Sequence, residues 1–119
     1  MRYPYNQNKY HSKKTTFRGR KFDSKKEAER FLYLEQLMKR GEISDLECQK
    51  MFVLLETQYE NGKCVEQRWT YTADFVYKDK NGRLVVEDVK GYRGGDAYRL
   101  FVHCRKMMRW RYHIEVVEV

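Results

Sequence analysis

The stretch Thr72–Lys90 reads TADFVYKDKNGRLVVEDVK and decides the fold, because two apolar runs in it flank a short polar turn. Asn81-Gly82 is a strong hairpin signal, since both residues tolerate the positive φ angles that tight turns between strands require. Side chains alternate between the two faces of a strand, so Asp88 and Lys90 project from the same face. The stretch predicts an antiparallel strand pair, with Asp74 on the first strand and an Asp-x-Lys at the end of the second.

The length and composition indicate one globular domain with its own core. The chain has 119 residues, of which 41% are hydrophobic and 15% aromatic, and this is enough to bury a core without a metal or disulfide staple. It has no apolar run as long as a membrane span and no apolar signal-peptide core. Cys48, Cys64 and Cys104 are odd in number and form no Cys-x-x-Cys pair. We therefore expect a cytoplasmic protein with no membrane partner.

Basic residues are concentrated in two segments that flank an acidic middle. Residues 1–26 carry nine Lys/Arg against a single acid, Asp23, and residues 90–111 carry seven against Asp96. Residues 27–89 carry nine basic and 13 acidic side chains. This distribution favours a polyanion whose backbone is brought to a carboxylate site, and tyrosines interleaved among the N-terminal cations favour nucleic acid. A basic surface that serves only solubility is the alternative.

The first 20 residues are basic and aromatic and show no sustained periodicity. We interpret residues 1–20 as an extended arm, with a short strand near Thr15–Phe22, and residues 21–119 as the single folded domain. A disordered tail is the alternative for the arm.

A helix is predicted from Ser24 to Arg40. Ser24 and Glu27 have the Ser-x-x-Glu spacing of a capping box, and Gly41 ends the helix. At 100° per residue the apolar residues cover one broad face, and Glu27 falls near the middle of that face, whereas Glu29 lies almost opposite. If one of these two acids serves a site, it is therefore Glu27. The alternative is that Glu27 only completes the capping box.

The rest of the chain predicts three strands in a meander, then a second helix and a final strand. The strands cover residues 48–56, 64–77 and 84–90, the helix covers 97–112 and the last strand covers 113–119. Alternation along the second strand places these residues on one face: Trp69, Tyr71, Ala73, Phe75 and Tyr77. The resulting order is α-β-β-β-α-β, which indicates an α/β fold.

The acids and the lysine of the strand pair have the chemistry that phosphodiester hydrolysis needs. Asp74 and Asp88 would supply the one or two carboxylates that Mg²⁺ usually takes from a protein. Lys90 would orient or deprotonate the attacking water, and Glu27 would bind a second cation or a metal-bound water. A buried structural ion pair is the alternative, because acids and bases pair across strands for ordinary reasons.

The order of these residues resembles the PD-(D/E)XK nuclease superfamily. The resemblance lies in Glu27 on a first helix, Asp74 on one strand and the run Val85–Lys90 on the next, within the α-β-β-β-α-β order. It implies a restriction-endonuclease-like α/β core, in which helices flank a mixed central sheet. The chain departs from the superfamily name in having Ala73 where the name has Pro. The acid of the Asp-x-Lys is Asp88, because the preceding glutamate falls on the other face of the strand.

Four blocks of sequence are similar to a family of small phage and prophage endonucleases, catalogued as a domain of unknown function, DUF1064. The blocks are Phe22–Arg30, Gly41–Glu47, Tyr71–Phe75 and Val86–Gly91, and they occur in the family's order. Gln49 stands where this family, and the nuclease subunit of some transposases, tend to carry Gln before an apolar strand. The resemblance implies a supporting catalytic role for Gln49. A polar residue that only fills the strand is the alternative.

Together these resemblances imply a Mg²⁺-dependent DNA endonuclease, with Mn²⁺ as a substitute cation. The expected catalytic residues are Glu27, Gln49, Asp74, Asp88 and Lys90, and the expected metal ligands are Glu27, Asp74 and Asp88. The cations expected to contact DNA are Lys13, Lys14, Arg18, Arg20, Lys21, Arg93, Arg99, Arg105 and Lys106. If the chain is phage-encoded, it would act in the cytoplasm of the host cell.

The resemblance also implies branched or junction DNA as the substrate, as for Holliday-junction resolvases. A resolvase needs two active sites and hence a homodimer, and the aromatic strand face with Trp69, Tyr71 and Tyr77 would serve the dimer or be covered by the second helix. Two other functions stay open. One is a non-catalytic DNA-binding accessory protein on a nuclease fold, and the other is a nuclease subunit that works within a transposase complex.

Overall fold

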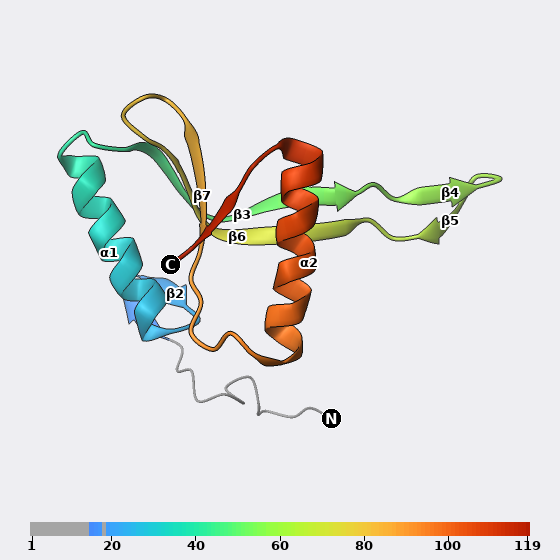
Figure 1. Ribbon diagram of the computed structural model, residues 1–119, viewed down its shortest axis with the longest axis horizontal. Helices are drawn as coiled ribbons and strands as arrows, with labels where there is room; N and C mark the ends of the chain where they lie inside the picture. Colours follow the sequence, from blue (N-terminus) through green and yellow to red (C-terminus); the bar gives the residue numbers. More distant parts are fainter. Residues whose placement is uncertain (1–14, 18) are drawn as a thin grey trace.

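A computed structural model describes residues 15–17 and 19–119 (Figure 1). The elements are β1 (Thr15–Phe17), β2 (Arg20–Phe22), α1 (Lys25–Lys39), β3 (Ser44–Leu55), β4 (Gln58–Glu60), β5 (Lys63–Glu66), β6 (Trp69–Lys78), β7 (Leu84–Asp88), α2 (Gly95–Tyr112) and β8 (Val116–Glu118). Most of the arm predicted over residues 1–20 lies outside the described residues, and so do Lys13, Lys14 and Arg18.

The central sheet has four strands in the order β3-β6-β7-β8, and α1 and α2 lie on either side of it (Figure 1). Neighbours β3, β6 and β7 are antiparallel, whereas β8 runs parallel to β7 after the crossover through α2. Apart from the small hairpins β1-β2 and β4-β5, the order is α1-β3-β6-β7-α2-β8. The predicted α/β class and the predicted α-β-β-β-α-β order are therefore confirmed.

Helix α1 forms as its sequence predicts and packs on one face of the sheet. The side chain of Ser24 accepts a hydrogen bond from the backbone N–H of Glu27 at 3.1 Å, and Gly41 adopts a φ of 76° just beyond the helix. Phe31 and Leu34 are buried in a core shared with β2, β3 and β6. Burying such side chains contributes about 1.5–3 kcal/mol each. This packing fixes the first turn of α1 against the sheet.

Helix α2 covers the opposite face of the sheet with a second core. Its buried residues Phe101, Cys104 and Met108 pack against β6, β7 and β8, where Val86 and Val116 are buried. The helix begins two residues before the predicted start. Among the described residues, no helix combines the length and the apolar character needed to cross a membrane.

The predicted single aromatic face of β6 is wrong beyond Ala73. Tyr71 and Ala73 belong to the core under α2, together with Val76, whereas Phe75 and Tyr77 belong to the core under α1. The change of face occurs at Asp74, and its neighbour on β3 is Gln49, which has a φ of 56°. A left-handed residue interrupts the pleat of the strand pair, so simple alternation does not continue through it.

Two predicted strands also differ from the observed ones. The strand predicted over residues 64–77 is divided into β5 and β6, and the β4-β5 hairpin projects from the end of the β3-β6 ribbon (Figure 1). Near the N-terminus, the single strand predicted over Thr15–Phe22 is an antiparallel hairpin of β1 and β2. This hairpin contacts α1, and the boundary predicted between residues 20 and 21 falls inside β2. Gly19, with a φ of 79°, supplies the turn that the strand pattern did not show.

Candidate active site at the end of β7

Three acids from separate elements meet near the end of β7. Asp88 is the last residue of β7, and the adjacent strand β6 contributes Asp74, next to the cross-strand pair Phe75–Glu87. Glu27 arrives from the first turn of α1, and its carboxyl group is buried. The prediction that Glu27 points inward rather than to water is confirmed by its 3% exposure. The hairpin and the helix cap together bring the three acids into one site.

Gln49 connects two of these acids. Its side-chain amide donates a hydrogen bond to Glu27 Oε2 at 2.9 Å and another to Asp74 Oδ1 at 3.1 Å. The second oxygen of Glu27 accepts from the Asp23 N–H at 3.0 Å, and that of Asp74 accepts from the Val89 N–H at 2.8 Å. Gln49 holds this position at a left-handed φ, a conformation that costs on the order of 1–3 kcal/mol for a residue with a side chain.

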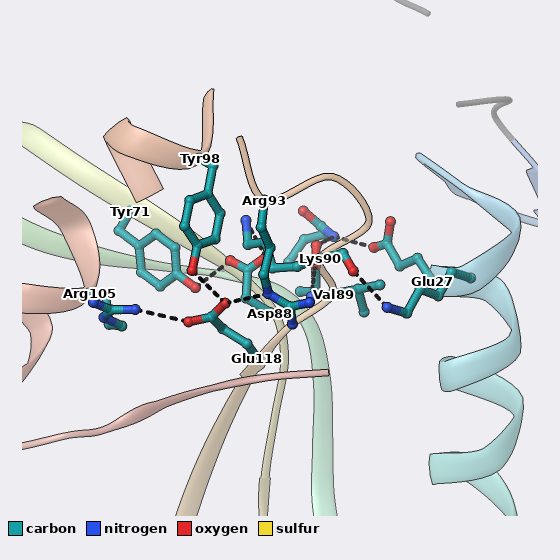
Figure 2. Close-up of polar contacts among 12 residues, drawn as sticks. Glu27, Tyr71, Asp88, Val89, Lys90, Arg93, Tyr98, Arg105 and Glu118 are labelled. Carbon is teal, nitrogen blue, oxygen red and sulfur yellow. Dashed lines mark hydrogen bonds and ion pairs between the residues drawn. The ribbon is translucent and has the colours of Figure 1, made fainter. Parts of the chain in front are cut away.

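Asp88 and Lys90 form the other half of the site (Figure 2). Lys90 Nζ lies 3.0 Å from Asp88 Oδ1, and Tyr71 donates its hydroxyl to Asp88 Oδ2 at 2.5 Å. The Lys90 ammonium also lies 3.8 Å from the centroid of the Phe101 ring, which favours a cation electrostatically. The strand end is held by β8, because the Val119 N–H donates to the Asp88 carbonyl at 3.0 Å. Asp88 and Lys90 share a face, as predicted.

Burial and mutual repulsion raise the pKa values of all three acids. Burial raises the pKa of Asp74 to about 6, and the negative charge of Glu27 adds to this effect, against the hydrogen bond from the Val89 N–H. Burial and the charge of Asp74 likewise raise the pKa of Asp88 to about 6, although Tyr71 and Lys90 oppose the shift. Burial also raises the pKa of Glu27. The site therefore concentrates negative charge that the fold itself compensates only in part.

This donor set fits a hard divalent cation. Within the described part of the chain, no group of three or more His, Cys, Asp or Glu side chains stands close enough together to form a complete metal site. Mg²⁺ does not need such a group, because it usually takes one or two carboxylates and keeps several waters. Asp74 and Asp88 offer that pair of oxygen ligands, and a cation would remove the repulsion that raises their pKa values.

The neighbouring residue Glu87 has a different environment. It lies on the α1 face of β7, where it accepts two hydrogen bonds from Arg30, at 2.8 and 2.6 Å, and a third from the Tyr77 hydroxyl. Its exposure is 1%. Each carboxylate oxygen thus has a donor, and this buried ion pair fastens α1 to the sheet. The sequence prediction that Glu87 faces away from Asp88 agrees with this arrangement.

Sequence reasoning missed two groups beside the acids. Alternation along the strand predicts only an aromatic face for Tyr71, but its buried hydroxyl donates to Asp88. Glu118 of β8 pairs in register with Asp88 and binds the side chains of Arg93, Tyr98 and Arg105 at 3.0, 2.9 and 2.9 Å (Figure 2). Burial tends to raise the pKa of Glu118, but these three donors outweigh it and lower the pKa. The parallel crossover that brings β8 beside β7 is the signal that would have placed Glu118 there.

The cations predicted to contact DNA are placed in several different environments. Arg93 and Arg105 converge on Glu118, next to the acids, and Arg99 pairs with the exposed Asp96 at 2.8 Å. Arg20 lies over the Phe31 ring at 5.4 Å, on the α1 side of the fold. Lys21 and Lys106 are exposed on β2 and α2. Tyr71 and Tyr77, suggested for a dimer face, are buried within the chain.

The fold and the site define an α/β protein with a buried acidic site where β7 ends beside the middle of β6. The chain belongs to the family described as Protein of unknown function (DUF1064), whose model matches residues 7–116. No curated protein and no solved structure matches the chain.

Proposed function

We propose that this protein is a Mg²⁺-dependent endodeoxyribonuclease with a PD-(D/E)XK-type active site, and that Mn²⁺ substitutes for Mg²⁺. The observation that carries the proposal is the pair Asp74 and Asp88, whose pKa values are raised to about 6, beside the Lys90 ammonium. A purely structural acid would be expected to have its charge matched, as that of Glu87 is. Perturbed acids with a specific cationic partner are typical of functional sites.

The residues of the chain would divide the work of hydrolysis among them. Asp74 and Asp88 would hold the cation, with Glu27 as a further ligand or as a ligand of its water, and the cation supplies Lewis-acid activation of the phosphate when it is bound. Lys90 positions the attacking water and places positive charge near the phosphate, since its Nζ is held at 3.0 Å from Asp88. Gln49 acts as a positioning residue, because its amide holds Glu27 and Asp74 at a fixed separation.

The charge distribution supports DNA as the substrate. Seven Lys/Arg against one acid in residues 90–111 follow the acidic site directly in the chain, and nine against one precede it in residues 1–26. Cations of this kind bind phosphates without reading sequence. We place the activity on branched or junction DNA of the phage type, in the cytoplasm, with a homodimer as the form that would cut both strands.

A non-catalytic DNA-binding accessory protein is the second candidate. The feature that favours it is that Arg93 and Arg105, two cations next to the site, can bind DNA independently of any metal. A nuclease subunit of a transposase complex is a variant of the first proposal, in which cleavage needs a protein partner.

The test is cleavage by the purified full chain with Mg²⁺ or Mn²⁺ on linear, nicked, flapped and four-way-junction DNA, resolved on a denaturing gel. We expect cleavage by the wild type, and loss of cleavage with retained DNA binding in Asp88→Ala and Lys90→Ala. Asp96→Ala is the matched control, because Asp96 is an exposed acid whose carboxylate pairs with Arg99 on α2. Salt-dependent binding without cleavage of any of these DNAs would favour the accessory protein. Wild-type cleavage by both site variants would refute the active-site assignment.

A further inference from the structure

A basic groove with an exposed tryptophan lies between α2 and β8, the strand next to β7 at the edge of the central sheet. It has a volume of about 810 Å³ and lies between the C-terminal half of α2 and β8. Its cations Arg105, Lys106 and Arg109 come from α2, which also supplies Trp110, and Glu118 comes from β8. None of the roles proposed above requires Trp110.

The groove is continuous with the candidate active site. Arg105 binds Glu118 at 2.9 Å at one end of the groove, and Glu118 is the register partner of Asp88 on the adjacent strand. Adjacent strands are about 4.8 Å apart, so this end of the groove lies one strand away from the acids. Trp110 is five residues beyond Arg105, which corresponds to roughly 7.5 Å along the axis of α2. A DNA strand that leaves the acids over Glu118 would therefore pass Trp110.

The chemistry of the groove suits an unpaired nucleic-acid strand. Arg105, Lys106 and Arg109 lie within two turns of α2, and Glu118 is the acid that holds Arg105. The pair between Arg109 and Glu115 is 3.6 Å long, with side chains 66% and 72% exposed, so it is weak and a phosphate can replace it. Trp110 is 72% exposed, which leaves its ring free to stack on a base. Cationic grooves with aromatic platforms bind single strands, because every unpaired base has a face that can stack.

We propose that this groove binds an unpaired DNA strand next to the cleavage site, with Trp110 stacked on a base and the α2 cations on the phosphates. The inference deepens the proposed function and rests on it for the biological role, since it selects DNA with an unpaired stretch beside the scissile bond. Paired bases are already stacked inside a duplex, so an intact duplex offers Trp110 no base face. The groove would therefore discriminate flapped or open branched DNA from linear duplex.

An exposed tryptophan beside an edge strand also suits a protein partner, including a second copy of this chain. The charge of the groove argues against a second copy as the occupant, because the same α2 cations line the groove in both copies. Burial of Trp110 by self-association is nevertheless an outcome that the experiment below identifies.

The test uses Trp110 as its own reporter. The chain has two tryptophans, and Trp69→Phe leaves Trp110 as the single one. The Trp69→Phe protein is titrated in EDTA with an oligo-dT single strand and with a duplex of the same length. We expect quenching of the Trp110 emission by oligo-dT, and at least several-fold weaker binding of the duplex. EDTA prevents metal-dependent cleavage, so binding is measured whether or not the protein is a nuclease.

Three variants of the otherwise wild-type chain test the role of the ring, with binding followed by anisotropy of a labelled oligo-dT. Trp110→Ala is expected to weaken binding by roughly tenfold, which is the range measured for loss of one stacking platform, and Trp110→Phe to retain most of the affinity. Tyr59→Ala is the matched control: Tyr59 is also exposed, at 65%, but lies on the projecting β4-β5 hairpin (Figure 1). It is expected to leave binding unchanged.

The outcomes separate the groove from the nuclease activity. Absence of quenching, or equal oligo-dT affinity in Trp110→Ala and the wild type, overturns the inference even if the protein cleaves DNA. A Trp110 emission that shifts with protein concentration and ignores oligo-dT overturns it in favour of self-association. Quenching and the tenfold loss in a protein that cleaves no DNA uphold the groove and refute the nuclease proposal.

Discussion

Glu87 and Asp88 are adjacent buried acids on one strand, yet the charge around each of them differs. Glu87 faces α1, and its oxygens accept hydrogen bonds from the Arg30 guanidinium and the Tyr77 hydroxyl. Asp88 faces α2 and shares its site with Asp74, and burial together with this second carboxylate raises its pKa to about 6. Both acids have a tyrosine donor and a cationic partner, so the presence of an ion pair does not distinguish them.

The difference lies in the balance of charge around each acid. One bidentate arginine matches the single charge of Glu87, which is the arrangement that makes a buried ion pair structurally sound. At Asp88, one lysine stands against Asp74 and Asp88, with Glu27 linked to Asp74 through Gln49. An excess of negative charge in a buried site costs stability, and it is retained where an external cation completes the balance. We infer from this comparison that Glu87 serves the fold, and the unmatched charge at Asp88 supports its proposed role in an active site.

The largest effect expected from this comparison is on cleavage in Asp88→Asn. Loss of a ligand removes several kcal/mol of metal-derived transition-state stabilisation, which corresponds to a loss of roughly 10³-fold or more in rate. The measurement is single-turnover cleavage in Mg²⁺, with the free energy of unfolding measured in urea as a check on folding. Asp96→Asn, an exposed acid, is the control and should cleave at the wild-type rate. An Asp88→Asn protein that cleaves within tenfold of wild type would contradict the assignment.

The next effect is on stability, in Glu87→Gln. The substitution leaves the Arg30 guanidinium half-buried without a carboxylate, and breaking such a pair typically costs about 3 kcal/mol. Urea unfolding at pH 7 measures this loss. Glu29→Gln is the control, because Glu29 lies on the exposed side of α1, the helix that carries Arg30. It should change the free energy of unfolding by less than about 0.5 kcal/mol. If Glu87→Gln left the free energy of unfolding unchanged, Glu87 would not be a structural acid, and the proposed division of the two β7 acids between fold and function would fail.

Sequence reasoning found the acids because local patterns place them. The Asn81-Gly82 turn and the alternation of β7 put Asp88 and Lys90 on one face, and the Ser24 cap places Glu27 on the buried side of α1. It failed where side-chain direction depends on a backbone irregularity, since Gln49 adopts a left-handed φ in the middle of β3 and the neighbouring strand changes face at Asp74. Period-two alternation contains no signal for such a residue.

The groups that sequence reasoning missed depend on contacts between distant parts of the chain. Tyr71 reaches Asp88 across the sheet, and Glu118 comes beside Asp88 only because α2 returns the chain parallel to β7. Their own sequence neighbourhoods show a strand with aromatic residues and a strand with alternating acids, which are ordinary surface and core patterns. Local sequence therefore specifies which acids are available, whereas tertiary pairing decides what charge surrounds each one.

The raised pKa values also predict how the stability of the metal-free protein depends on pH. This dependence tests the comparison between Glu87 and Asp88. Asp74 and Asp88 have pKa values of about 6 in the fold against an ordinary value of 3.8, so the folded protein binds more protons than the unfolded chain between these values. The free energy of unfolding should therefore fall as the pH rises from about 4 to about 7, by up to roughly 3 kcal/mol for each acid, because one pKa unit corresponds to about 1.4 kcal/mol. Urea unfolding in EDTA measures this, and Asp88→Asn should flatten the fall.

The outcome is diagnostic because a matched carboxylate behaves differently. If Asp74 and Asp88 were stabilised as anions, their pKa values would lie below 3.8, so these groups would make stability rise with pH up to about 4 and would leave it level from there to about pH 6. A wild-type profile parallel to that of Asp88→Asn between pH 4 and 6 would show that Asp88 contributes no such penalty. Addition of Mg²⁺ at pH 7 should stabilise the wild type more than Asp88→Asn, because binding to the folded state alone raises its stability.

The smallest expected effect is a change in the pKa of Asp88, and it distinguishes Tyr71 from Tyr77. Tyr71 donates to Asp88, and this hydrogen bond lowers the pKa of that carboxyl, so Tyr71→Phe should raise the pKa of Asp88 by a few tenths of a unit to about one unit. Tyr77→Phe removes the equivalent donor from Glu87 and should leave the pKa of Asp88 unchanged, because Tyr77 lies on the other face of the sheet. Carbon-13 NMR titration of the aspartate carboxyls in EDTA measures both. Equal shifts of Asp88 in the two variants would mean that the faces of β7 are electrostatically coupled, and the division between a structural acid and a functional one would then fail.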